Sequence, residues 1–78
     1  MIDVPLNVSV GSGWQARRAQ VSEASSSIVL VTLGHDATES HVRVDVGKRI
    51  FIDESPTVIT PNDVDRIVEQ VIAALHAP

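Results

Sequence analysis

Residues 60–76 read TPNDVDRIVEQVIAALH, and this stretch decides the fold class. Thr60 is a good helix N-cap, Pro61 fits the first helical position, and Asp63 stands where it can close a capping box. Apolar residues then recur at helical spacing: Val64, Ile67, Val68, Val71, Ile72 and Leu75. They form one apolar stripe with polar residues opposite, so we expect an amphipathic helix over about residues 61–76.

The first ten residues show a different period. Apolar and polar residues alternate strictly over residues 2–10, which is typical of a half-buried strand. Pro5 lacks the N–H that a sheet ladder needs, so we expect this strand at a sheet edge. Gly11-Ser12-Gly13 predicts a hairpin turn, after which residues 14–22 form a weaker strand.

The middle of the chain predicts three more strands. Residues 28–33 are apolar at nearly every position, which favours a strand over about 27–34 that is covered on both faces. A polar loop with His35 and Glu39 follows, and residues 41–46 and 49–53 then form a second hairpin. A three-residue loop would pair Val44 with Ile50 and gather the aliphatic side chains on one face. That register leaves Phe51 on the second face.

These elements predict one α+β domain over residues 1–78. Its architecture is a small antiparallel sheet of four to five strands, a meander of hairpins, with the C-terminal helix packed on one face. A helix of about 16 residues spans roughly 24 Å and covers only one face of such a sheet. We therefore expect another copy of the chain, a partner, or the curl of the sheet to cover the second face.

Composition limits the function classes. The 78 residues hold ten acidic and six Lys or Arg residues, for a net charge of −4, which disfavours a protein that coats nucleic acid. The lack of cysteine excludes disulfides, thiolate catalysis and cysteine-based zinc sites. The first residues have no leader pattern and no apolar run approaches the roughly 20 residues of a membrane span, so we expect a cytoplasmic location.

The chain carries no motif that indicates catalysis. No serine lies in a Gly-x-Ser-x-Gly elbow, and the acids at the start of the predicted helix are explained by its dipole. We therefore predict no enzyme, no catalytic residue, no cofactor and no metal. A third-ranked hypothesis is a small metal-dependent protein or enzyme that uses His35, Asp36 and His41 in the polar loop.

Our leading hypothesis is a small non-enzymatic protein-binding module with an accessory, regulatory or inhibitory role. It would act through self-association or by docking on a larger protein. The candidate interface residues are Trp14, Val29, Val31 and Phe51. Trp14 could cover the end of the core or serve as an exposed anchor for a partner. The sequence does not show which face of the third strand points inward, so Val29 and Val31 could be core residues instead.

The alternative is a module that binds RNA or single-stranded DNA through sheet arginines. Its candidate residues are Arg17, Arg18, Arg43 and Arg49. Because Arg17 and Arg18 are adjacent in a predicted strand, we expect their side chains to leave opposite faces. A mixed, solvated sheet surface is the simpler interpretation.

Overall fold

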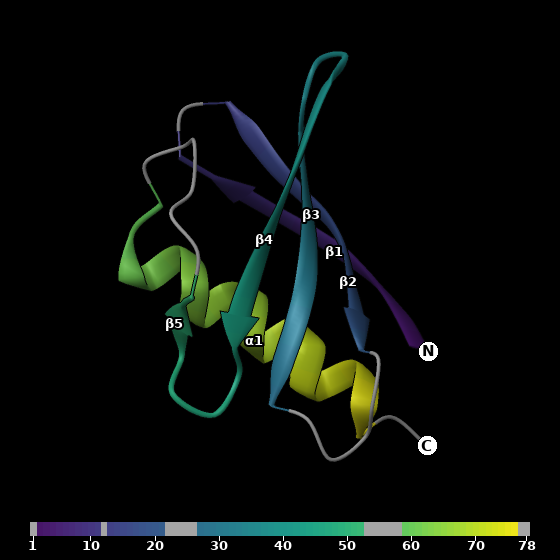
Figure 1. Cartoon of the computed structure of the whole chain (residues 1–78), viewed down its shortest axis with the longest axis vertical. Helices are drawn as coiled ribbons and strands as arrows, with labels where there is room; N and C mark the ends of the chain where they lie inside the picture. The colour runs from purple at the N-terminus through teal and green to yellow at the C-terminus, as the bar shows by residue number, and fades with distance from the viewer. Residues whose placement is uncertain (1, 12, 22–26, 53–58, 77–78) are drawn as a thin grey trace.

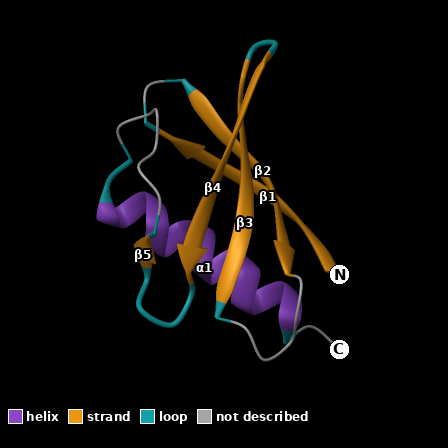
Figure 2. Cartoon of the chain, viewed as in Figure 1, coloured by secondary structure: helices purple, strands orange, loops and turns teal. Residues whose placement is uncertain are grey.

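A computed structural model describes residues 2–11, 13–21, 27–52 and 59–76. Within these residues the chain forms β1 (Ile2–Val10), β2 (Trp14–Val21), β3 (Ile28–His35), β4 (Thr38–Asp45), β5 (Ile50–Phe51) and α1 (Pro61–Leu75) (Figures 1 and 2). The strands pair antiparallel in chain order, β1-β2-β3-β4-β5. The predicted α+β fold, an antiparallel meander with one C-terminal helix, is confirmed. The predicted ends of two strands, at residues 22 and 53, lie outside the described residues.

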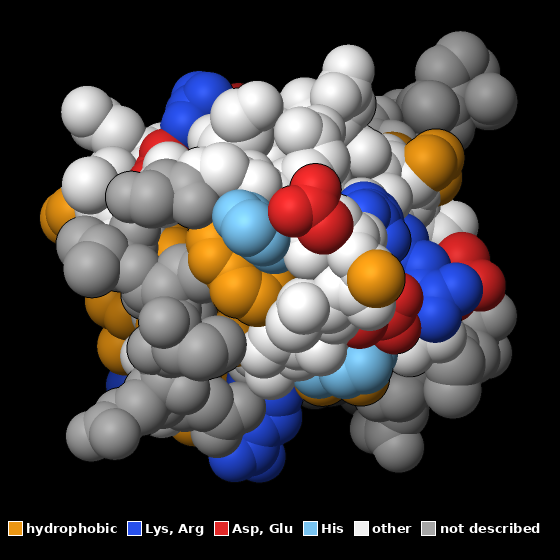
Figure 3. All heavy atoms as spheres, turned by 90° about the horizontal axis from the view of Figure 1, so that it is seen from above, with side chains coloured by type: hydrophobic (Ala, Val, Ile, Leu, Met, Phe, Trp, Pro, Cys, Tyr) orange, Lys and Arg blue, Asp and Glu red, His pale blue; other side chains and the backbone are white. Residues whose placement is uncertain are grey.

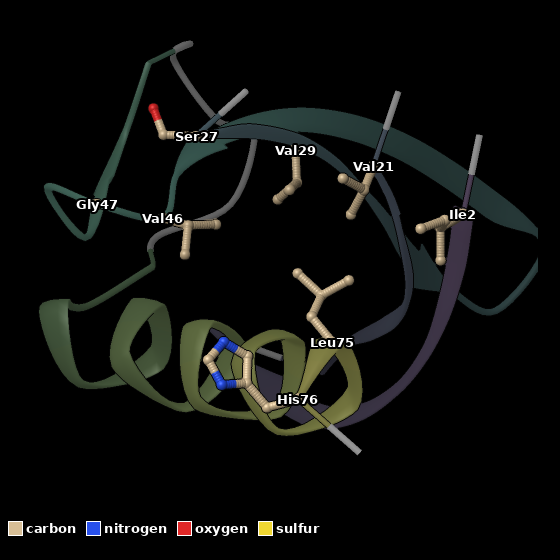
Figure 4. A pocket seen from close by; sticks show the side chains of 8 residues that line it. All are labelled: Ile2, Val21, Ser27, Val29, Val46, Gly47, Leu75 and His76. Carbon is tan, nitrogen blue, oxygen red and sulfur yellow. The ribbon is translucent and has the colours of Figure 1, made fainter. Parts of the chain in front are cut away.

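α1 lies across one face of the sheet, and the sheet curls around it (Figures 1 and 4). The predicted capping box is present, because Thr60 and Asp63 each accept the other's backbone N–H with a side-chain oxygen. The apolar stripe of α1 meets the alternating apolar residues of the strands. The resulting core contains Val4, Leu6, Val8, Val10, Ala16, Ala19, Val21, Val29, Val31, Leu33, Val42, Val44, Val64, Ile67, Val68 and Val71.

β1 forms one edge of the sheet, as Pro5 predicts. Side chains of α1 form hydrogen bonds with backbone groups on the edge of β1 that faces away from β2. The Gln70 amide accepts from the Asn7 N–H at 3.0 Å and donates to the Asn7 carbonyl at 3.3 Å. Arg66 donates to the Ser9 carbonyl at 2.7 Å. These bonds occupy backbone groups that an exposed edge strand would otherwise offer to another chain.

β2 departs from the predicted alternation at Arg17 and Arg18. Its register with β3 shifts between Ala16 and Arg18, and both arginines are exposed. A bulge of this kind adds one residue to a strand, so Ala16 and Ala19 both reach the core with two residues between them. The expectation that the two arginines leave opposite faces is therefore wrong, because both lie on the face turned away from α1, the outer face.

The β4–β5 hairpin has a different register from the one predicted. Val44 pairs with Phe51 and Asp45 pairs with Ile50 across a four-residue connection, residues 46–49. Arg49 adopts a left-handed conformation, with φ of 58°, and its N–H donates to the Asp45 carbonyl at 2.7 Å. The extra loop residue reverses the parity of β5, so Phe51 packs against the core and Ile50 lies on the outer face.

The β3–β4 connection is shorter than the predicted polar loop. His35 pairs with Thr38, which leaves only Asp36 and Ala37 in the turn, and Asp36 takes a left-handed φ of 52°. β4 therefore begins at Thr38 instead of residue 41.

Asp63 ties the start of α1 to the β1–β2 hairpin. Burial raises the pKa of its carboxyl group, but hydrogen bonds from the Thr60 backbone, Arg66, Gly11 and the Thr60 hydroxyl outweigh burial and hold the pKa below its usual value. A carboxyl whose pKa is lower in the folded state stabilises the fold above its unfolded pKa of about 3.9. That contribution is lost as the pH falls through the lower, folded pKa.

We predict that the Asp63→Asn variant is less stable than the wild type near neutral pH and that the difference narrows in acid. Urea unfolding at about pH 7, 4 and 2.5 measures it, with the exposed Asp3→Asn as the control variant. A free-energy difference that stays constant from neutral pH to the most acid point would contradict the role assigned to this carboxylate.

A second prediction tests the register of β5. Phe51→Ala should lower the free energy of unfolding by about 1–3 kcal/mol because the ring is partly buried against the core. Ile50→Ala should change it by about 0.5 kcal/mol or less because that side chain is 50% exposed. Urea midpoints of the two variants decide between the registers, since the opposite order would require Ile50 in the core.

Candidate functional site

Four aliphatic side chains form a patch on the outer face, which we call the outer patch: Ile28, Leu30, Ile50 and Ile52. Ile28, Ile50 and Ile52 are 39%, 50% and 42% exposed, and Leu30 is half-buried. Leu30 pairs with Arg43, whose carbonyl accepts the Ile52 N–H at 3.0 Å. In the next row of the sheet, Asp45 lies between Ile28 and Ile50. The patch therefore spans three strands, with one arginine and one aspartate among its aliphatic members.

The four predicted interface residues lie elsewhere. Val29 is 2% exposed and Val31 is fully buried, so both side chains point into the core and not to the surface. Phe51 packs on the core side. Trp14 is half-buried at the end of the core, where its ring lies 5.3 Å from the His35 ring at an angle of 41°.

A sequence signal for the outer patch did exist in β3. Thr32 and Gly34 lie on the same face of β3 as Ile28 and Leu30. A polar residue or a glycine in an otherwise apolar strand indicates the face that points away from the core. Thr32 and Gly34 lie under the long side chains of Arg18 and Arg17. Arg18 approaches the Thr32 hydroxyl at 3.5 Å, and Thr32 is only 2% exposed.

The predicted nucleic-acid arginines divide into two groups. Arg17 and Arg18 on β2 and Arg43 on β4 lie on the outer face. Arg49 instead pairs with α1, 3.3 Å from Asp65 and 3.0 Å from Glu69. The hydrogen bonds to Glu69 and then to Asp65 raise the pKa of the Arg49 guanidinium.

The predicted metal-binding residues do not come together. His35 has the core-side parity of Leu33 and contacts Trp14, with its Nδ1 3.7 Å from an Asp36 oxygen. His41 pairs with Thr32 on the outer face, 3.5 Å from a Glu39 oxygen. The two imidazoles thus leave opposite faces of one hairpin, and the described residues contain no cluster of three or more potential ligands.

An apolar pocket of about 540 Å³ lies at the C-terminal end of α1 (Figure 4). Its lining consists of Ile2, Val21, Ser27, Val29, Val46, Gly47, Leu75 and His76. Ser27 and His76, the polar members, lie on opposite sides of it (Figure 4). The pocket therefore offers an apolar surface but no paired nucleophile and base.

Comparisons of the chain with protein-family models, with curated proteins and with solved structures found no match. Within the described residues, no helix has the length and apolar character needed to cross a membrane.

The contact between Arg17 and Gly34 generates a further prediction. A Cβ at residue 34 would lie 2.1 Å from the Arg17 Cζ, so Gly34→Ala must displace the arginine from the sheet surface. We expect Gly34→Ala to be destabilising in the wild type and close to neutral in an Arg17→Ala background. A double-mutant cycle by urea unfolding should give a coupling of about 0.5 kcal/mol or more, and purely additive effects would contradict the contact.

Proposed function

We propose that this chain is a small non-enzymatic protein-binding module, with an accessory or regulatory role, that binds a protein partner through the outer patch. The observation that carries the proposal is the gathering of Ile28, Leu30, Ile50 and Ile52 on one exposed face. The four side chains form two aliphatic pairs, one on β3 and one on or next to β5, with Arg43 and Asp45 of β4 between them. Apolar side chains grouped on one face mark an interaction site more often than scattered exposed aliphatics do. A cytoplasmic location is part of the proposal.

The chemistry of the outer patch suits a protein surface. Burying its aliphatic atoms against a partner would stabilise a complex by about 25 cal/mol per Å² of apolar area. Arg43 stands between Leu30 and Ile52, and arginine among apolar side chains is a frequent centre of binding energy at interfaces. The partner we expect presents an apolar surface to the outer patch.

The nucleic-acid alternative has less support. Proteins that bind single strands stack bases on exposed aromatic rings. The chain has one Trp, one Phe and no Tyr, and both Trp14 and Phe51 pack toward the core. Acidic and basic side chains are also interspersed at the end where β3 turns into β4 (Figure 3), so that end does not form a purely cationic surface.

A site-specific photocrosslinker tests the proposal in the cells that make the protein. We predict that benzoylphenylalanine at position 52 forms an adduct with a partner protein, identified by mass spectrometry. The same group at position 75 should form less, since Leu75 is comparably exposed, at 43%, but lies on α1. Equal adducts from both positions, or none from position 52, would argue against the outer patch.

A paired variant separates binding from folding. Ile50→Ser together with Ile52→Ser should change stability by only about 1 kcal/mol in total because both side chains are largely exposed. The pair should nevertheless abolish the adduct formed by a crosslinker at position 28. Retention of that adduct in a folded double variant would remove the two isoleucines from the interface.

A further inference from the structure

β4 pairs with β3 along one edge, and β5 covers only part of its other edge. β3 pairs with all eight residues of β4 without a register shift, whereas β5 pairs only with Val44 and Asp45. The last bond on this side is the one that the Arg43 carbonyl accepts from Ile52. In the described part of the chain, no strand pairs with the outer side of residues 38–42, and the β3–β4 turn projects beyond the other strands (Figure 1).

The backbone groups on this side belong to Glu39 and His41. Alternate residues of an antiparallel strand direct their N–H and C=O groups to the same side. The carbonyls of Arg43 and Asp45 accept bonds from the β5 side, so Glu39 and His41 have the same direction. Neither residue makes a backbone hydrogen bond on that side among the contacts of the described residues.

The two edges of the sheet are therefore unlike. At β1, side chains of α1 occupy the outward groups of Asn7 and Ser9. Residues 38–42 contain no proline, no lysine and no bulge, three features that protect many edge strands from pairing. The carboxylate of Glu39 and the imidazole of His41 are groups that can pair with each other.

We infer that this edge pairs antiparallel with the same edge of a second copy of the chain, about a twofold axis at Ser40. Among the described residues, the Arg43 carbonyl already accepts a bond from Ile52, which leaves the outward backbone groups of Glu39 and His41 for a second copy. The Ser40-centred register uses both residues, since Glu39 of each copy then exchanges two hydrogen bonds with His41 of the other. This inference is independent of the outer patch.

The side chains agree with this register. Glu39 lies opposite His41 of the second copy, and the same carboxylate and imidazole already meet at 3.5 Å within one copy. Thr38 lies opposite Val42 on the core-side face, a pairing of two β-branched residues. A parallel arrangement would instead place Glu39 beside Glu39, where like charges repel.

A cysteine at the proposed axis tests the register directly. The two Ser40 residues would form a non-hydrogen-bonded pair with Cα atoms about 4.5 Å apart, within the range that a disulfide spans. The chain has no cysteine of its own, so Ser40→Cys gives one thiol per copy. We expect mild oxidation to convert most of this variant to a covalent dimer.

Two matched variants provide the controls. Thr38→Cys places the thiol two residues from the axis, opposite Val42 of the second copy, and Ser9→Cys places it on the closed edge. Both should cross-link at least about fivefold more slowly than Ser40→Cys, as expected when the reacting groups are held apart. Equal rates for Thr38→Cys and Ser40→Cys, or no dimer from Ser40→Cys, would overturn the inference.

Charge exchange tests the pairing without cysteine. By light scattering, the wild type should rise above its monomer mass of 8.4 kDa as concentration increases. Glu39→Lys alone and His41→Glu alone should each stay monomeric. Their equimolar mixture should associate, because the lysine introduced in one variant then faces the glutamate introduced in the other. Asp3→Lys, with the same charge change on β1, should behave as the wild type.

The outcomes separate the possible occupants of the edge. A wild type that stays at 8.4 kDa throughout, or a mixture that fails to associate while the wild type does, contradicts self-pairing through Glu39 and His41. The double variant Ile50→Ser, Ile52→Ser should associate as the wild type does. Loss of self-association in that variant would assign the dimer to the outer patch and overturn the inference.

Discussion

The hydrogen bonds from α1 to the outer side of β1 are the constraint on which the rest of the structure depends. Gln70 and Arg66 reach the backbone of Asn7 and Ser9, while Asp63 joins the helix cap to Gly11. Together they fix the helix against one edge and one face of the sheet. Among the described residues, no second element covers the outer face and no strand pairs with residues 38–42 of β4 on the edge away from β3.

The same constraint explains how the polar groups of a small fold are satisfied. Asp63 is buried, yet it accepts bonds from Thr60, Arg66 and Gly11, which together hold its pKa down. Buried polar groups of this kind are tolerated when each has a partner. The bond from Gly11 joins this cluster to the β1–β2 hairpin, and Arg66 also donates to the Ser9 carbonyl, so the capping of the helix and the closing of β1 share the Arg66 side chain.

The sequence predicts the fold well because helix and strand periods differ and the strands are joined by short connections. It fails where the chain adds a residue inside a ladder. The bulge at Arg17 and the four-residue connection before Ile50 each reverse the parity of the residues that come after them, and neither has a distinctive composition. The assumed three-residue loop therefore places Phe51 on the surface that Ile50 occupies. In β3, apolar residues at both parities leave the sequence unable to choose between Val29 with Val31 and Ile28 with Leu30 for the core.

Residue-resolved amide hydrogen exchange at a low and a high protein concentration tests the contrast between the two edges most directly. We predict that the Asn7 amide is protected at both concentrations because it donates to Gln70. The Glu39 and His41 amides should exchange rapidly in the dilute protein and become protected in the concentrated protein. An unprotected Asn7 amide, or Glu39 and His41 amides whose exchange does not change with concentration, would contradict a sheet with one edge closed by α1 and the other paired with a second copy.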